Sequence, residues 1–214
     1  MMHAQKAVRG RLLVPVVVAG VVLALAAKPV PGSLGLDSPD QQRREAILDY
    51  IALTNPDAPI HKLEGFPGAL VAVSREVGLD HCLALAQAEV ESRFWPDAVG
   101  SAGEIGLYQV LPSTATLWGW RGAELFDPHV NTRVALTYFS DILARRPALR
   151  DALAEYNGGP RNRSPYYALT VLENYARVLR HAKLACEPER NPEFAAPERR
   201  EVIAPGRPRL APAS

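Results

Sequence analysis

Residues 80–96 read DHCLALAQAEVESRFWP, and this stretch has the pattern of one amphipathic helix. Asp80 is a suitable N-cap, and the closing proline disfavours helical backbone in the residue before it. Positions 83, 87, 91 and 94 follow the spacing i, i+4, i+8 and i+11, which places them on one face. The pattern therefore predicts that Glu91 lies on an apolar stripe with Leu83 and Phe94.

An acid on an apolar stripe is a candidate proton donor. A carboxyl held against apolar neighbours has a raised pKa, because burial disfavours its ionised form, and this suits general acid chemistry at neutral pH. The helix alone leaves open that Glu91 lies at the rim of the stripe and pairs with an arginine. Glu89 is about 200° further round the helix, so we predict that it faces solvent and that the two glutamates are not a catalytic pair.

The rest of the chain also has helical rather than strand periodicity. Prolines fall between the apolar segments, where they end helices. We predict a mainly α single domain over residues 40–186, preceded by a Pro/Gly-rich linker over 29–39. Residues 187–214 are rich in Pro, Arg and Glu and are predicted to form a disordered tail. The expected helices are 40–53, 67–78, 81–94, 113–119, 129–146, 148–157 and 166–184.

The N-terminal segment indicates export. Four basic residues and no acidic ones occur in residues 1–28, and an apolar run from Leu12 to Ala27 ends in small residues. This pattern is typical of a signal peptide, and a retained membrane anchor is the alternative. The rest of the chain then contains 20 basic and 23 acidic residues, a net charge of about −3. The resulting weak negative charge argues against nucleic acid as a partner.

The chain has two cysteines, Cys82 and Cys186. In an oxidising compartment they could form a disulfide, and two buried free thiols are the alternative. A metal site is not expected, because the neighbouring His81 and Cys82 could hardly converge on one ion.

Five motifs follow one another in a fixed order. They are ESRFWPDA at 91–98, GLYQVLPSTA at 106–115, LFDPHVN at 125–131, EYNGGP at 155–160 and YARVL at 175–179. Together, over about residues 66–184, they resemble the soluble lytic transglycosylase (SLT) domain. That family is part of the lysozyme-like superfamily and is related to goose-type lysozymes. The resemblance implies a lysozyme-like helical fold.

The resemblance also assigns roles to individual residues. Glu91 would be the sole catalytic acid and base. Tyr175 would pack near this acid, with helix-core packing as the alternative, and Tyr108 replaces the family's usual Met in the wall of a sugar subsite. Gly100 stands where the family often has Ser. The residues expected to line the cleft around the scissile sugar are Ser92, Gln109, Tyr156 and Asn157.

The activity implied by the resemblance is cleavage of peptidoglycan without a cofactor. The β-1,4 bond between N-acetylmuramic acid and N-acetylglucosamine would break, leaving 1,6-anhydromuramyl ends in the bacterial periplasm. A secretion or conjugation apparatus is a further expected partner, and membrane contact is expected only through an uncleaved N-terminal segment. One alternative is a muramidase that hydrolyses the bond, with Asp97 as its candidate second carboxylate. The other is a non-catalytic peptidoglycan-binding scaffold.

Overall fold

The computed structural model describes residues 38–161 and 164–191 of the 214-residue chain. The predicted signal or anchor segment, 1–28, lies outside these residues, as does all of the predicted linker except its last two positions. Within the described residues no regular strand is present, and the extended backbone is limited to two isolated bridges that join Ile105 to Val99 and to Val110. The protein is thus mainly α-helical, as predicted.

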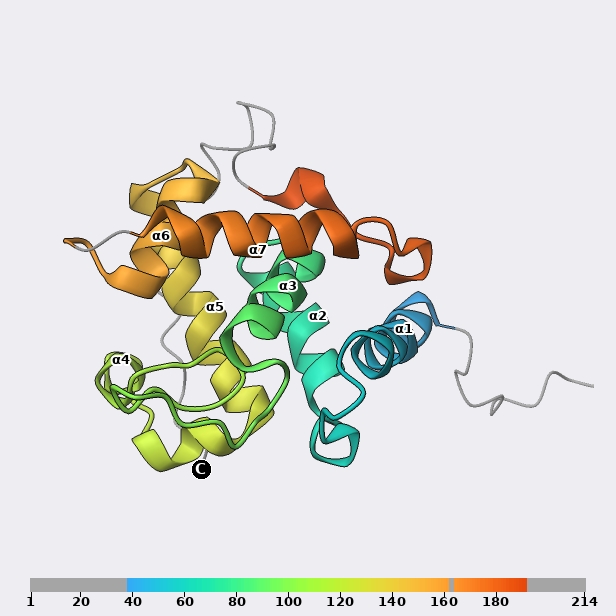
Figure 1. Ribbon diagram of the computed structural model, residues 1–214, viewed down its shortest axis with the longest axis horizontal. Helices are drawn as coiled ribbons and strands as arrows, with labels where there is room; N and C mark the ends of the chain where they lie inside the picture. Colours follow the sequence, from blue (N-terminus) through green and yellow to red (C-terminus); the bar gives the residue numbers. More distant parts are fainter. Residues whose placement is uncertain (1–37, 162–163, 192–214) are drawn as a thin grey trace, which may run out of the picture. The chain divides into compact units, whose positions relative to one another are not determined.

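Seven α-helices build the domain (Figure 1). All seven were expected from the sequence, and most of their ends lie within two residues of the predicted ones. The last helix ends at Val178, six residues before its predicted end, and a short 3-10 turn over Ala182–Leu184 follows it. The helices are α1 Pro39–Thr54, α2 Phe66–Glu76, α3 His81–Ser92, α4 Pro112–Thr116, α5 Pro128–Arg145, α6 Leu149–Gly158 and α7 Pro165–Val178.

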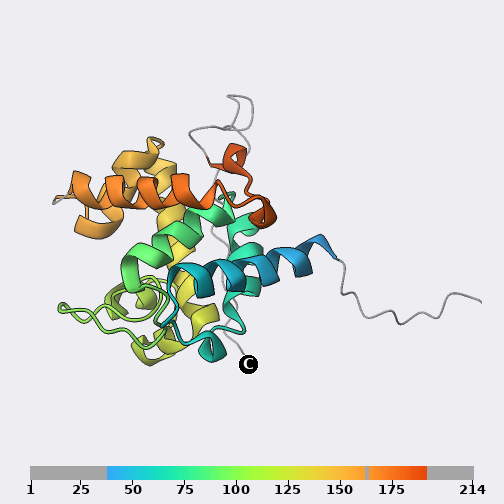
Figure 2. The same cartoon turned by 45° about the vertical axis from the view of Figure 1, so that its right-hand side comes forward.

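Helix α3 is the centre of the packing. Every residue from His81 to Glu89 is buried, and α7 crosses one side of the helix while α2 packs on another (Figure 1, Figure 2). The alanines of α3 let these neighbours approach closely, since a methyl group takes little space. The helix ends two residues earlier than predicted, because Arg93 and Phe94 both take left-handed backbone conformations with φ of 53° and 65°.

The prediction that Glu89 faces solvent is wrong. Tyr50 of α1 and Arg177 of α7 both reach Glu89, and this residue is only 9% exposed. Its carboxylate accepts hydrogen bonds from the Tyr50 hydroxyl at 3.0 Å and from the Arg177 guanidinium at 2.7 Å. A buried charge needs such partners, so this ion pair explains how the acid is accommodated in the interior.

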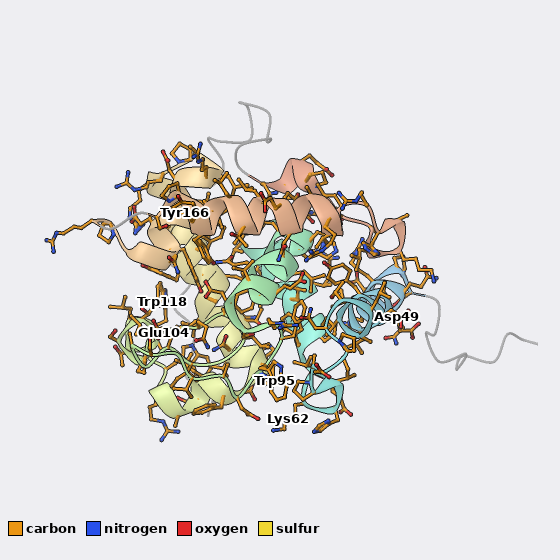
Figure 3. All side chains as sticks on the ribbon, viewed as in Figure 1. Asp49, Lys62, Trp95, Glu104, Trp118 and Tyr166 are labelled. Atoms are coloured by element: carbon orange, nitrogen blue, oxygen red, sulfur yellow. A yellow bond between two sulfur atoms is a disulfide. The ribbon has the colours of Figure 1, made fainter. Side chains whose placement is uncertain are left out.

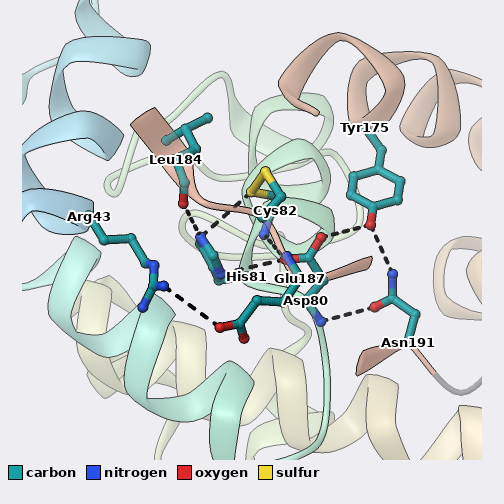
Figure 4. Close-up of a disulfide and its surroundings, with 9 residues drawn as sticks. Arg43, Asp80, His81, Cys82, Tyr175, Leu184, Glu187 and Asn191 are labelled. Carbon is teal, nitrogen blue, oxygen red and sulfur yellow. Dashed lines mark hydrogen bonds and ion pairs between the residues drawn. A yellow bond between two sulfur atoms is a disulfide. The ribbon is translucent and has the colours of Figure 1, made fainter. Parts of the chain in front are cut away.

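The first turn of α3 is tied to the end of the described chain (Figure 4). Cys82 and Cys186 form a disulfide across a sequence separation of 104 residues. The Asp80 carboxylate accepts hydrogen bonds from the Cys82 and Glu187 amides at 3.1 and 2.9 Å, and Asn191 accepts one from the Asp80 amide at 3.0 Å. The ordered chain therefore continues five residues beyond the boundary predicted at 186. The remainder of the predicted tail lies outside the described residues.

In the described part of the chain, we find no helix with both the length and the apolar character needed to cross a membrane.

Candidate active site

Glu91 lies in the last turn of α3, where the helix meets a cleft of about 480 Å³. The cleft is formed by the end of α3, the loop that leads to α4, one residue each of α4 and α5, and the end of α6. Its lining residues are Glu91, Gly100, Ser101, Glu104, Gln109, Val110, Leu111, Thr114, Tyr138, Tyr156, Asn157, Gly158 and Gly159. A cleft of this size accommodates a small-molecule ligand or one or two sugar rings.

The surroundings of Glu91 keep its carboxyl protonated to unusually high pH. Burial raises the pKa of Glu91 to about 7, and the negative charge of Glu104 adds to this rise. The Tyr167 hydroxyl opposes it, because it donates a hydrogen bond of 2.5 Å to Oε1 of Glu91 and so favours the ionised form. A carboxyl with a pKa near the working pH can both give and take a proton.

Two tyrosines lie next to Glu91, and one of them, Tyr156, lines the cleft. The rings of Tyr156 and Tyr167 are stacked with centroids 6.5 Å apart and an interplanar angle of 15°. Tyr156 donates its hydroxyl hydrogen to the carbonyl oxygen of Tyr108 at 2.9 Å. Burial raises the pKa of both phenols well above the ordinary value. Tyr167 is therefore a neutral hydrogen-bond donor to the acid at neutral pH.

A tight loop after α3 brings Gln109 into the cleft. Gly106 has a φ of 79°, and a Cβ atom there would lie 2.4 Å from Nδ2 of Asn131 and 2.6 Å from the carbonyl oxygen of Leu125. Glycine is thus required for both its backbone conformation and its size. Gln109 itself has a φ of 48°, and its Nε2 donates to the carbonyl oxygen of Gly106 at 2.9 Å. These contacts fix the amide of Gln109 at the cleft wall.

The Asn131 side chain on α5 holds this loop in place with three hydrogen bonds. Its Oδ1 accepts a hydrogen bond from the Tyr108 amide at 2.9 Å, and its Nδ2 donates to the carbonyl oxygens of Ile105 at 2.8 Å and Leu125 at 2.9 Å. The side chain is fully buried. Sequence reasoning assigned no role to Asn131, although it closes the LFDPHVN motif. An amide that satisfies three backbone groups is a typical way to fix an irregular loop.

The structure brings together only part of the predicted site. Glu91, Gln109, Tyr156 and Asn157 all line the cleft. Ser92 lies behind the cleft wall, and its hydroxyl donates to the carbonyl oxygen of Leu107 at 2.9 Å. Ser92 therefore joins the end of α3 to the loop and does not form part of the lining.

Two of the predicted tyrosine roles need correction. The Tyr108 side chain is fully buried and donates to the carbonyl oxygen of Ala84 at 3.1 Å, so it packs in the core and does not form the wall of a subsite. Tyr175 does not pack near Glu91. Its hydroxyl donates to Asp80 at 2.7 Å, at the opposite end of α3, which agrees with the alternative of core packing. Tyr167, which the sequence analysis missed, contacts the acid instead.

The second carboxylate of the cleft is also not the expected one. Asp97 is half-exposed, forms an ion pair with Lys62, and is absent from the cleft lining. Glu104 is a lining residue, and its charge acts on Glu91. Figure 3 shows Glu104 and Lys62 at separate places on the molecule. The short loop that places Glu104 could not be recognised from residue spacing alone.

A metal ligand set is not formed at the cysteines. Asp80, Cys82 and Cys186 place three potential ligand atoms within 4.8 Å of one another. The two sulfur atoms are bonded to each other in the disulfide, which leaves no thiolate to bind an ion.

The central region of the chain matches a known family model. Residues 72–170 match the family model described as the transglycosylase SLT domain, which confirms the predicted resemblance. An inactive mutant of the lytic transglycosylase Slt from Pseudomonas aeruginosa is similar, with 23% identity, a TM-score of 0.43, and coverage of 70% of this chain and 30% of that one. The 70 kDa soluble lytic transglycosylase from Escherichia coli has 22% identity, a TM-score of 0.44, and coverage of 77% and 28%. This chain thus spans less than a third of either protein.

Proposed function

Residues 72–170 form a transglycosylase SLT domain, and we propose that the protein is a peptidoglycan lytic transglycosylase with Glu91 as its single acid and base. The bond cleaved is the β-1,4 linkage between N-acetylmuramic acid and N-acetylglucosamine. The observation that carries the proposal is the position of Glu91, a carboxyl with a pKa of about 7 at the wall of a cleft large enough for sugar rings.

The first step is departure of the leaving sugar. Protonated Glu91 gives its proton to the glycosidic oxygen, and the bond between this oxygen and the anomeric carbon breaks. The carbonyl oxygen of the muramic 2-acetamido group bonds to the anomeric carbon, which leaves a cationic oxazolinium ring and an ionised Glu91. The negative charge on Glu91 balances the positive charge on the sugar.

The second step closes the anhydro ring. Ionised Glu91 takes the proton from the 6-hydroxyl of the same sugar, and the oxygen O6 attacks the anomeric carbon as the acetamido oxygen leaves. The product is a 1,6-anhydromuramyl end, and Glu91 is protonated again. Water is not consumed. A carboxyl with its pKa near 7 suits this cycle, because both protonation states are accessible at neutral pH.

Neighbouring residues orient the acid and the sugar. Tyr167 holds one oxygen of Glu91 by its hydrogen bond, which leaves the other oxygen for the substrate. Gln109 and Asn157 present amide groups at the cleft wall that suit the hydroxyl and acetamido groups of the substrate. Tyr156 adds an aromatic ring to the cleft lining. Ser92 acts on the backbone of the loop and not on the sugar.

Product analysis tests the proposal. Purified sacculi are digested with the wild-type protein, and the soluble fragments are analysed by mass spectrometry. We expect anhydromuramyl ends from the wild type, no soluble fragments from Glu91→Gln, and wild-type products from the control Glu173→Gln, which alters an exposed acid on α7. Cleavage by Glu91→Gln at the wild-type rate would show that the acid is wrongly assigned. Binding of sacculi without any release by the wild type would indicate a scaffold.

Hydrolysis is the second candidate function, because Glu104 places another carboxylate in the same cleft. Two-carboxylate glycosidases use such a residue to activate water or to attack the sugar. Reducing muramic ends in place of anhydro ends would identify a muramidase. The same digest therefore distinguishes the two activities.

We also propose that the protein acts outside the cytoplasmic membrane. The N-terminal pattern predicts export, and the disulfide between Cys82 and Cys186 fits an oxidising compartment such as the periplasm. A role beside a secretion or conjugation apparatus remains part of this proposal. Fractionation of cells that express the full chain tests the location, and crosslinking in the same cells tests the partner.

A further inference from the structure

We propose that Glu104 is a second functional carboxylate of the cleft, which stabilises the positive charge that develops on the sugar while Glu91 acts as the acid. The inference rests on the proposed function, since it concerns the same cleft and the same reaction. It adds a residue for which neither the sequence motifs nor the family match supplies a role.

The backbone of a short turn places the Glu104 carboxylate. The Gly100 amide donates to the carbonyl oxygen of Glu104 at 2.8 Å, and the Gly103 amide donates to the carbonyl oxygen of Gly100 at 3.1 Å. The side chain then folds back over the turn, where Oε2 accepts a hydrogen bond from the Ala102 amide at 3.0 Å. The carboxylate is therefore held in one place at the cleft wall.

Gly100 provides the space for this arrangement. A Cβ atom at position 100 would lie 2.4 Å from Oε2 of Glu104 and 2.7 Å from Oε1 of Gln109. Both distances are far below van der Waals contact, so any side chain at position 100 would displace the two cleft groups. This explains why glycine stands at a position where the family often has serine. The position of the Glu104 carboxylate therefore requires glycine at position 100.

Glu104 has no cationic partner to neutralise it within the described residues. Other acids of the domain do have one, such as Asp97 with Lys62 and Glu89 with Arg177. Among the described residues that line the cleft, none is a lysine, arginine or histidine. A carboxylate without such a partner makes the cleft electrostatically negative, which favours a positively charged intermediate over a neutral substrate.

The two carboxyl groups of the cleft differ in their surroundings. Glu91 faces the neutral phenols of Tyr167 on α7 and Tyr156 on α6, and the nearby negative charge is that of Glu104. Burial keeps Glu91 protonated, whereas Glu104 is partly exposed and its charge acts on Glu91. Glu91 can thus supply the proton, while the negative charge of Glu104 stabilises the positive charge left on the sugar.

The test replaces Glu104 by glutamine. Glu104→Gln keeps the size of the side chain and an oxygen that can accept the Ala102 amide hydrogen, but it removes the charge. We expect kcat to fall by about 10- to 100-fold, because two charges a few ångströms apart in a partly buried site interact with that strength. KM should change little, because the charge develops after binding. The matched control is Glu64→Gln, which alters an exposed acid away from the cleft and should keep the wild-type kcat.

The pH profile separates an electrostatic role from a structural one. Removal of the Glu104 charge lowers the pKa of Glu91, so the loss of activity at high pH should begin at a lower pH in Glu104→Gln than in the wild type. If the substitution only disturbed the fold of the loop, activity would be lost at the same high pH as in the wild type. Gly100→Ala offers a second test, since it displaces the carboxylate without removing it and should also lower kcat.

The outcomes also separate this inference from the proposed function. If Glu104→Gln keeps the wild-type kcat and pH profile while Glu91→Gln is inactive, Glu104 has no such role and the proposed function stands. If the wild-type protein releases no fragments from sacculi, the proposed function itself fails. A loss of kcat in Glu104→Gln without any shift of the pH limb would also contradict the electrostatic role.

Discussion

Oε1 of Glu91 accepts a hydrogen bond from the Tyr167 hydroxyl at 2.5 Å, and this contact joins the last turn of α3 to the first turn of α7. It orients the proposed acid and partly offsets the effect of burial on its pKa. The two helices run in opposite directions at this interface, because Tyr175, further along α7, contacts Asp80 at the start of α3.

Loss of the Tyr167 hydroxyl should change both the rate and its pH dependence. Tyr167→Phe removes a hydrogen bond to the ionised form of Glu91, so the pKa of Glu91 rises and the high-pH limb of kcat moves to higher pH. We expect kcat at its optimum to fall by about 10-fold, because the carboxyl loses its orientation. The control is Tyr166→Phe, since Tyr166 is 78% exposed and lies at the surface (Figure 3). Identical profiles for both variants would contradict this account.

Replacement of the acid should stabilise the protein in a pH-dependent way. The pKa of Glu91 in the folded protein, about 7, is above its ordinary value of 4.5, so the folded state holds this proton more tightly than the unfolded state does. Glu91 therefore costs stability as the pH rises from about 4.5 to 7, and Glu91→Gln removes that cost. We expect the free energy of unfolding to increase by about 1 to 3 kcal/mol at pH 8 and by little at pH 4. Urea denaturation at the two pH values measures the difference, and an equal effect at both would exclude it.

Asn131 should be essential for the shape of the loop. Asn131→Ala removes one accepted and two donated hydrogen bonds. The Tyr108 amide and the Leu125 carbonyl lose this partner, and the Ile105 carbonyl keeps only the Val110 amide. We expect a loss of about 2 to 4 kcal/mol in the free energy of unfolding. Asn174→Ala on α7 serves as the control, because that residue is only partly buried. Chemical denaturation of the three proteins checks this prediction, which fails if the two variants lose similar amounts.

Reduction of the disulfide should lower stability without altering the cleft directly. The loop closed by Cys82 and Cys186 is long, so the bond strongly restricts the unfolded chain. We expect the free energy of unfolding to fall by about 2 to 5 kcal/mol in the Cys82→Ser, Cys186→Ser double variant. Added reductant should lower the wild-type denaturation midpoint towards that of the variant and leave the variant unchanged. A wild-type midpoint insensitive to complete reduction would contradict the prediction.

The helices and the burial of Glu91 on one face of its helix could be predicted, because both follow from the order of neighbouring residues. The apolar spacing around Glu91 and the prolines between segments are properties of neighbouring residues, and the structure follows them closely. The environment of Glu89 could not be predicted, because its partners Tyr50 of α1 and Arg177 of α7 come from distant parts of the chain. Periodicity within one helix describes its own faces but not which of them a neighbour covers.

The tyrosines of α7 also show that sequence periodicity does not determine which residues of two neighbouring helices meet. Tyr167 and Tyr175 lie two turns apart on one face, about 12 Å along the helix axis, so only one of them can contact Glu91. The motif that contains Tyr175 led to the prediction that this residue packs near Glu91. Which of the two tyrosines contacts Glu91 depends, however, on the direction in which α7 crosses α3. Likewise, Glu104 reaches the cleft through a turn whose shape follows from Gly100 and from backbone hydrogen bonds.

The attachment of Asp80 and Cys82 to residues 186–191 bears on how the protein matures. The partners that complete the start of α3 are supplied more than one hundred positions later in the chain. The helix that bears the proposed acid therefore attains its final form only after translation has passed Asn191 and an oxidant has joined the sulfurs. A nascent chain interrupted before that point would have the whole of α3 but no anchor for its first turn.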